Sequence, residues 1–155
     1  MTQIKVGVVD VYVVHQTAES RRVLVLRRAA QGTRCPLAWE TVHGRIEPGE
    51  RPEQAAVREV AEETGLTIQR LYNVTTQAFY LHGMGAVQVA VVFCAFVAEP
   101  LEPTLGPEHG TAEWLDFAAA RERFAWPRER EALDHVKHLF AFGDAGPLED
   151  VLRVF

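Results

Sequence analysis

The 155-residue sequence has few cysteines and no long hydrophobic segment. Its two cysteines, Cys35 and Cys94, are far apart and form no CxxC pattern, which argues against a disulfide framework or a zinc site and favours a reducing compartment. The most apolar stretch, residues 87–97, is short, valine-rich and interrupted by glutamine, which is typical of a strand and not of a membrane span. Residues 1–5 lack the features of a secretory signal. These absences predict a cytoplasmic protein without a membrane partner.

Positive charge is also scarce. The chain has 16 lysines and arginines against 21 aspartates and glutamates, for a formal net charge of −5. Proteins that bind nucleic acids usually carry a basic stripe, and none is visible here. A nucleic-acid partner is therefore not expected. A small anionic substrate stays compatible with this charge if bound metal ions reverse its sign locally.

The order of apolar and turn-forming segments predicts the α+β class. Residues 4–14 and 22–28 predict an antiparallel pair of strands, and residues 67–80 and 86–98 predict a hairpin. The other predicted elements are short strands over 39–42 and 111–115 and helices after Pro52, over 117–124 and over 128–142. We expect one domain, residues 1–155, with a mixed sheet between helices. The tail, residues 148–155, is weakly amphipathic and is expected to pack on the domain or on a second subunit of a homodimer.

A cluster of carboxylates on the first predicted helix is the strongest functional signal. At about 100° per residue, Glu59, Glu62 and Glu63 project within roughly a quarter-turn of one another. The apolar residues expected on the opposite, core-facing side are Val57, Val60 and Ala61. Like charges at this spacing repel one another unless a cation lies among them, and hard oxygen ligands suit Mg²⁺ or Mn²⁺.

Turn and helix signals surround this cluster. Pro48-Gly49 favours a tight turn, Pro52 suits the first turn of a helix, and Gly65 is a typical helix stop. Three interpretations of this segment are open: an ordinary surface helix, a structural metal site, or a catalytic Mg²⁺ site for phosphoryl chemistry. Carboxylates on a single helix leave coordination positions open, which a closed structural site would fill.

The segment resembles the Nudix box, G-x5-E-x7-R-E-U-x-E-E-x-G-U, where U is a bulky aliphatic residue. Its nine defined positions are filled by Gly44, Glu50, Arg58, Glu59, Val60, Glu62, Glu63, Gly65 and Leu66. The resemblance implies the α/β/α Nudix sandwich for nearly the whole chain. It also implies metal-dependent hydrolysis of a nucleoside diphosphate linked to another group.

The resemblance implies roles for individual residues. The metal ligands it implies, for Mg²⁺ or its substitute Mn²⁺, are Glu59, Glu62, Glu63 and the backbone carbonyl of His43. Many members of the family have a second glycine where this chain has His43. Glu50 and Arg58 resemble the pair that braces the loop against the helix, and Arg58 belongs with the glutamates to the implied catalytic set.

Candidates outside the box are fewer. Members of the family use a further carboxylate, for which we expect Glu108, with Glu113 as the alternative. Arg27 and Arg28 end a predicted strand, either in solvent or with one of them directed at a substrate phosphate. Trp39 fits the core, the wall of a cleft, or a surface on which a base stacks.

The second half resembles the bacterial dihydroneopterin triphosphate pyrophosphatase and dATP pyrophosphohydrolase group. The resemblance rests on Glu108-His109, on residues 113–116, on Trp126 and on residues 39–42, with one extra residue after Trp126. It predicts hydrolysis of a nucleoside or pterin triphosphate to pyrophosphate and a monophosphate. The alternatives are ADP-ribose, a dinucleoside polyphosphate or a nucleotide sugar as the substrate, or a nucleotide-binding regulator without turnover.

Overall fold

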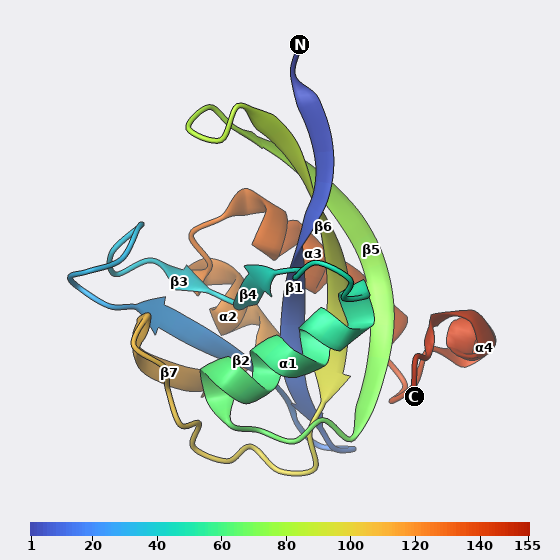
Figure 1. Ribbon diagram of the computed structural model, residues 1–155. Coiled ribbons are helices and arrows are strands. Elements are labelled where there is room, and N and C mark those ends of the chain that lie inside the picture. Colours follow the sequence, from blue (N-terminus) through green and yellow to red (C-terminus); the bar gives the residue numbers. More distant parts are fainter.

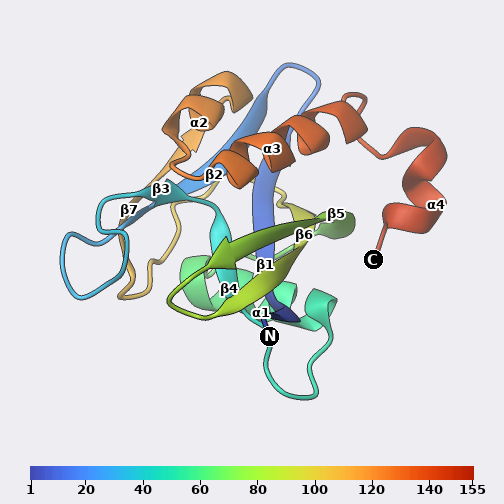
Figure 2. The same cartoon turned by 90° about the horizontal axis from the view of Figure 1, so that it is seen from above.

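Helices cover both faces of a mixed seven-stranded sheet in the computed structural model, which describes all of residues 1–155 (Figures 1 and 2). The strands are β1 (Gln3–Gln16), β2 (Arg21–Arg28), β3 (Trp39–Glu40), β4 (Val42–Arg45), β5 (Arg70–Leu81), β6 (Ala86–Phe96) and β7 (His109–Leu115). The helices are α1 (Pro52–Thr64), α2 (Phe117–Arg123), α3 (Pro127–Leu139), the 3-10 helix η1 (Gly146–Leu148) and α4 (Glu149–Leu152). The predicted α+β class with a mixed sheet between helices is confirmed.

The sheet has the order β3-β2-β1-β6-β5, with β4 paired to β1 and β7 paired to β2. Strands β1 and β6 are parallel, and all other pairs are antiparallel. β1 and β2 pair only over residues 14–16 and 21–23, after which β4 takes the place beside β1 and β3 and β7 pair with β2. The sheet therefore divides where β1 and β2 separate, and the chain passes from the β2 half to the β1 half between β3 and β4.

Alternation along β1 divides the core into two layers. Val9, Val11 and Val13 pack with α1, whereas Tyr12 and Val14 pack with α2 and α3. Figure 2 shows α1 on one side of the sheet and α2 and α3 on the other. Because successive side chains of a strand point to opposite faces, Asp10 belongs to the α3 side.

Most predicted elements are present, but the segment 39–42 is not one strand. Thr41 interrupts it, because its amide donates to the Glu129 carboxylate at 2.6 Å and its hydroxyl donates to the Val11 carbonyl at 2.6 Å. These bonds replace those of a sheet ladder, so β3 and β4 join different halves of the sheet.

The expected core face of α1 is partly wrong. Val60 is buried, but Val57 is 40% exposed and Ala61 is also exposed. The buried side of α1 instead carries Ala55, Ala56, Glu59, Val60, Glu63 and Thr64. Two carboxylates thus lie on the side of the helix that packs against the sheet, which a pattern of apolar residues alone does not predict.

The C-terminal tail packs on the domain. The amide of Val154 donates to the Leu71 carbonyl at 2.8 Å, and the hydroxyl of Tyr72 donates to the Glu149 carboxylate at 2.8 Å. Both contacts join the tail to β5, at the right of Figure 1. No helix in the chain has the length and apolar character that crossing a membrane requires.

Candidate active site

The candidate site is built where β4 leads into α1. Gly49 follows Pro48 with φ of 78°, in the left-handed region that glycine adopts without strain. Pro52 lies in the first turn of α1, and Gly65 ends the helix with φ of 70°. The predicted turn, helix start and helix stop are therefore all present, and they orient the carboxylates of α1 toward β4.

Gly44 allows β4 and α1 to approach closely. A Cβ at this position would overlap the carboxylate group of Glu59. Glu59 is accordingly only 8% exposed. The glycine of the box thus seats this carboxylate directly on the β4 backbone.

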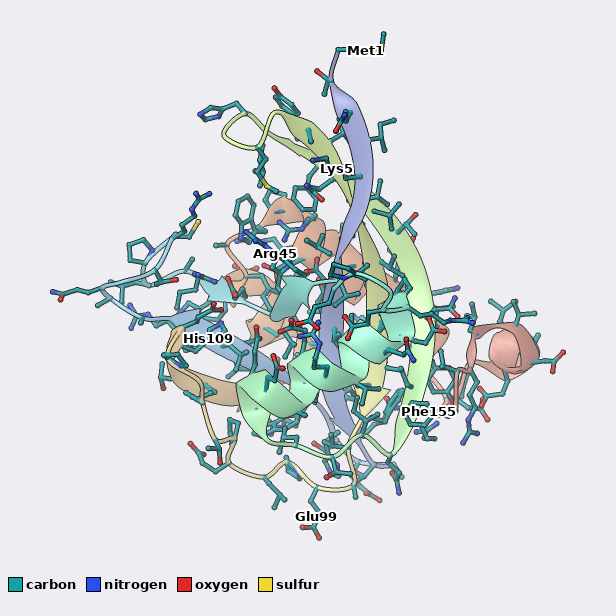
Figure 3. The ribbon with its side chains drawn as sticks, viewed as in Figure 1. Met1, Lys5, Arg45, Glu99, His109 and Phe155 are labelled. Atoms are coloured by element: carbon teal, nitrogen blue, oxygen red, sulfur yellow. The ribbon has the colours of Figure 1, made fainter.

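Arg58 braces the loop against the helix, as expected. Its Nε and Nη2 donate to the two carboxylate oxygens of Glu50, each at 2.8 Å. Nη2 also donates at 2.8 Å to the carbonyl of Arg45, which lies at the end of β4 (Figure 3). Hydrogen bonds from Arg58 and from the backbone of Glu47 lower the pKa of Glu50 to about 2. Glu50 is therefore ionised at neutral pH, and its pairing with Arg58 fixes the loop geometry.

The third guanidinium nitrogen of Arg58 contacts the acidic cluster. Nη1 donates to Glu59 at 2.7 Å and to Glu62 at 3.3 Å. Arg58 is thus the counterion of these two carboxylates as well as the partner of Glu50. Glu62 is the solvent-facing member of the cluster, with 59% of its side chain exposed.

Among the carboxylates of the cluster, Glu63 has the fewest hydrogen bonds and positive charges to offset its burial. It is 8% exposed, and its Oε2 has no hydrogen-bond partner. Burial, followed by the charges of Glu59, Glu40 and Glu108, raises the pKa of Glu63 to about 9. Without a cation this group is protonated at neutral pH, and a cation placed beside it would favour the ionised form.

The donor chemistry of this cluster fits a hard divalent cation. It consists of carboxylate oxygens, one of them buried and unpartnered, on one side of a single helix. As the side chains stand, no group of three or more Asp, Glu, His or Cys residues is arranged to hold a metal ion. The Arg58 guanidinium supplies the positive charge between Glu59 and Glu62 in this arrangement.

The two carboxylates considered outside the box lie in different surroundings. Glu108 is exposed in the loop before β7, and its charge adds to the effect of burial in raising the pKa of both Glu59 and Glu63. Glu113 pairs with Arg123 of α2 at 3.3 Å. Glu113 is aligned with Val25, which belongs to the core layer on the α2 and α3 side. Glu108 is therefore the carboxylate that lies near the acidic cluster.

Arg27, Arg28 and Trp39 do not form one site. Arg28 is held internally, donating to Glu40 at 3.2 Å and also bonding to Thr33. The guanidinium of Arg27 lies 5.8 Å from the centre of the Trp39 ring. Arg27 and Trp39 are aligned with each other and lie on the α2 and α3 side of the sheet. A phosphate contact through Arg28 would require it to give up bonds that it already makes.

A buried pair next to the site has no counterpart among the expected residues. His109 Nε2 lies 3.1 Å from Oε2 of Glu40, and these residues are 5% and 6% exposed. His109, labelled in Figure 3, begins β7 and directly follows Glu108 in the chain. The Ala29 amide also donates to the Glu108 carbonyl at 2.9 Å. These bonds fix the loop that carries Glu108.

A second unexpected group lies on the other face of the sheet. Asp10 is fully buried, and its Oδ1 lies 2.5 Å from Nδ1 of His43. Burial opposes ionisation of Asp10, but His43 and Arg128 outweigh it and keep its pKa below the usual range. Glu129, also buried, has a raised pKa because of burial and the nearby charge of Asp10. An aspartate within the apolar run of residues 8–14 was the one signal in the sequence that could have pointed to this group.

The chain is similar to known proteins in sequence and in fold. The family model described as the NUDIX domain matches residues 5–136. Among curated relatives, an octanoyltransferase of Myxococcus xanthus is 36% identical over 117 residues, covering 74% of this chain and 32% of the relative. A MutT-like protein of Streptomyces ambofaciens is 33% identical over 112 residues, covering 69% of this chain and 63% of the relative. The chain therefore spans less than two thirds of the length of either relative.

Solved structures show the same fold. An Ap4A hydrolase from Caenorhabditis elegans superposes with a TM-score of 0.75 at 21% identity, over 88% of this chain and 98% of that one. A MutT protein from Methanosarcina mazei superposes with a TM-score of 0.69 at 22% identity, over 88% of this chain and 95% of that one. At these identities the likeness concerns the fold.

Proposed function

Because the chain belongs to the NUDIX domain family, we propose that it is a metal-dependent pyrophosphohydrolase that cleaves a nucleoside or pterin triphosphate into pyrophosphate and a monophosphate. The observation that carries this proposal is the acidic cluster of α1, in which Glu63 is buried, with its Oε2 unpartnered, beside Glu59 and Glu62. A surface helix has no reason to bury two of three neighbouring carboxylates. In a site that receives a cation, the positive charge compensates the buried carboxylates.

Members of this family generally use divalent metal ions, and we propose Mg²⁺, with Mn²⁺ as a substitute. Glu59, Glu62, Glu63 and the carbonyl of His43 would hold the ion. When bound, it would neutralise the pyrophosphate oxygens and lower the pKa of water near the phosphorus. The oxygen-only donor set supports Mg²⁺ or Mn²⁺ over softer metals.

Each residue of the chain has a defined task in the proposed reaction. Arg58 fixes the loop through its bidentate bond to Glu50, and its Nη1 contacts with Glu59 and Glu62 would give way to a bound cation. Glu63, whose pKa is raised to about 9 without a cation, would be held in its ionised form by a bound cation. Glu108 accepts a proton from the attacking water at the open side of the cluster, where it is exposed. The His109–Glu40 pair holds the loop that presents Glu108.

The triphosphate substrate is the finer part of the proposal. It is supported by the sequence likeness to the dihydroneopterin triphosphate and dATP pyrophosphohydrolases, and by a stretch of 47 residues that is 47% identical to a Bacillus subtilis protein described as an 8-oxo-dGTP diphosphatase. That stretch covers 30% of this chain. The competing substrates within the family are ADP-ribose, dinucleoside polyphosphates and nucleotide sugars.

The test is a hydrolysis screen with and without Mg²⁺. It covers dihydroneopterin triphosphate, the nucleoside and deoxynucleoside triphosphates, ADP-ribose, diadenosine polyphosphates and nucleotide sugars, each with the wild type and with Glu63→Gln. We expect Mg²⁺-dependent release of pyrophosphate from at least one triphosphate, and a large loss in the variant. Inactivity of both proteins on every compound would leave only a nucleotide-binding regulator, whereas equal measurable rates for the two proteins would refute the role of Glu63.

A further inference from the structure

On the sheet face opposite α1, one buried carboxylate holds two basic side chains. Oδ1 of Asp10 lies 2.5 Å from Nδ1 of His43, and Oδ2 lies 3.4 Å from Nε of Arg128. Asp10 comes from β1, His43 from β4, and Arg128 from the first turn of α3. Three elements that are distant in sequence therefore converge on a single acid.

Arg128 is fixed in place by more than this ion pair. Its guanidinium carbon lies 4.4 Å from the centre of the Phe79 ring and 4.8 Å from that of Trp126. Its backbone carbonyl accepts a hydrogen bond from Nε2 of Gln77 at 2.7 Å. Aromatic rings and a buried carboxylate together restrict the rotamers of a long side chain, so the guanidinium is held ready before any ligand arrives.

The donors that remain free point to the class of ligand. Arg128 contacts Asp10 through Nε, neither of its terminal nitrogens makes a hydrogen bond to another side chain, and 14% of the side chain is exposed. Nε2 of His43 is also without a partner, and 32% of that side chain is exposed. The terminal nitrogens of arginine are donors at every relevant pH, and their planar arrangement matches the oxygens of a phosphate.

Arg128 is linked to the candidate active site through Asp10 and His43. His43 directly precedes Gly44, the residue that seats Glu59 on β4. The two sites are therefore connected through adjacent residues of one short strand.

We propose that Arg128, positioned by Asp10, binds the phosphate that stays on the nucleoside or pterin product. This inference rests on the proposed function, because it assigns one group of the proposed substrate to a residue outside the box. Arg128 binds substrate and product, whereas Asp10 is a positioning residue that acts through Arg128 and His43. The rings of Phe79 and Trp126 form the apolar border next to which the nucleoside lies.

The test measures binding without turnover. Adenosine and guanosine 5′-monophosphates, and the corresponding nucleosides, are titrated by calorimetry in the presence of a chelator and without divalent metal. The wild type is expected to bind at least one monophosphate more tightly than its nucleoside. Arg128→Met is expected to weaken binding of that monophosphate by roughly tenfold to a hundredfold, the usual effect of losing a charge-assisted hydrogen bond, and to leave nucleoside binding unchanged.

Arg123→Met is the matched control. Arg123 also lies over a tryptophan, 4.8 Å from the centre of the Trp39 ring, and also pairs with a carboxylate, Glu113, at 3.3 Å. It is expected to change neither affinity. If Arg128→Met fails to fold, as judged by circular dichroism, Arg128→Lys replaces it, since lysine keeps the charge but loses the fork. It should also weaken monophosphate binding selectively.

Two results would overturn the assignment. One is a folded Arg128 variant that binds monophosphates as tightly as the wild type, and the other is a wild type that prefers neither monophosphate to its nucleoside. Both are separable from a failure of the proposed function, because the titration needs neither metal nor hydrolysis. If Arg128 binds monophosphates but the protein hydrolyses nothing, only the proposed hydrolase function is refuted. If the protein hydrolyses its substrate but monophosphate binding does not depend on Arg128, only the Arg128 site is refuted.

Discussion

The buried Glu63 makes the metal-free protein sensitive to pH in an unusual direction. Its pKa is raised to about 9 in the folded state, by burial and by the charges of Glu59, Glu40 and Glu108, from an ordinary value of 4.5. Between these two values the folded state holds a proton that the unfolded state has lost. The contribution of this group to stability is therefore fully present below the unfolded pKa and is lost as the pH rises toward the folded pKa.

The magnitude follows from linkage. One proton bound only by the folded state changes the free energy of unfolding by about 1.4 kcal/mol per pH unit, so the wild type should lose up to about 4 kcal/mol between pH 5 and pH 8 through this group. That is a large share of the ~5–15 kcal/mol that stabilises a typical domain. Glu63→Gln cannot titrate, so its stability should vary less steeply with pH. It should exceed the wild type at the alkaline end.

The assay is urea unfolding followed by circular dichroism, with a chelator present, at several pH values for both proteins. The difference between the two free energies should increase steadily with pH. Adding Mg²⁺ should then stabilise the wild type more at higher pH, because the cation binds the ionised carboxylate. Parallel pH profiles for the two proteins would show that Glu63 is not held protonated in the folded state, and would refute this reasoning.

Two further predictions concern the geometry of the site. Gly44→Ala places a Cβ where the Glu59 carboxylate lies. It should lower the turnover rate by roughly a hundredfold or more, the scale expected when a catalytic group is misplaced by about 1 Å. The control is Gly83→Ala, whose Cβ would meet nothing within 4 Å and which should be neutral in the same rate assay. Glu108→Gln should lower the turnover rate by about 10²–10⁴-fold with metal binding retained, whereas Glu113→Gln should have little effect. Exchanged effects in this second pair would assign the proton transfer to Glu113.

The sequence was most informative where function depends on local spacing. The turn at Gly49, the helix stop at Gly65 and the pairing of Glu50 with Arg58 all lie within one short segment, and each was predicted correctly. The strands and the hairpin followed from apolar runs between turns. The side of α1 that packs on the sheet was not predicted correctly, because the absence of a side chain at Gly44 of β4 leaves room for Glu59 to be buried there.

What could not be predicted are the contacts between distant segments. Asp10 and Arg128 are separated by more than a hundred residues, and only the packing of α3 on the sheet brings them together. The pairing of Glu40 with His109 likewise depends on two strands that flank β2. Periodicity identifies the elements but carries no information on which of their polar ends meet.

The most direct test of the central claim is the release of pyrophosphate from the preferred triphosphate in ¹⁸O-labelled water, measured with and without Mg²⁺. We predict that the wild type requires the metal, that one product contains a single ¹⁸O atom from water, and that Glu63→Gln reduces the rate by at least about a hundredfold, the scale of losing a principal electrostatic contribution. Equal rates for the wild type and the variant, or full activity in the presence of a chelator, would contradict the account.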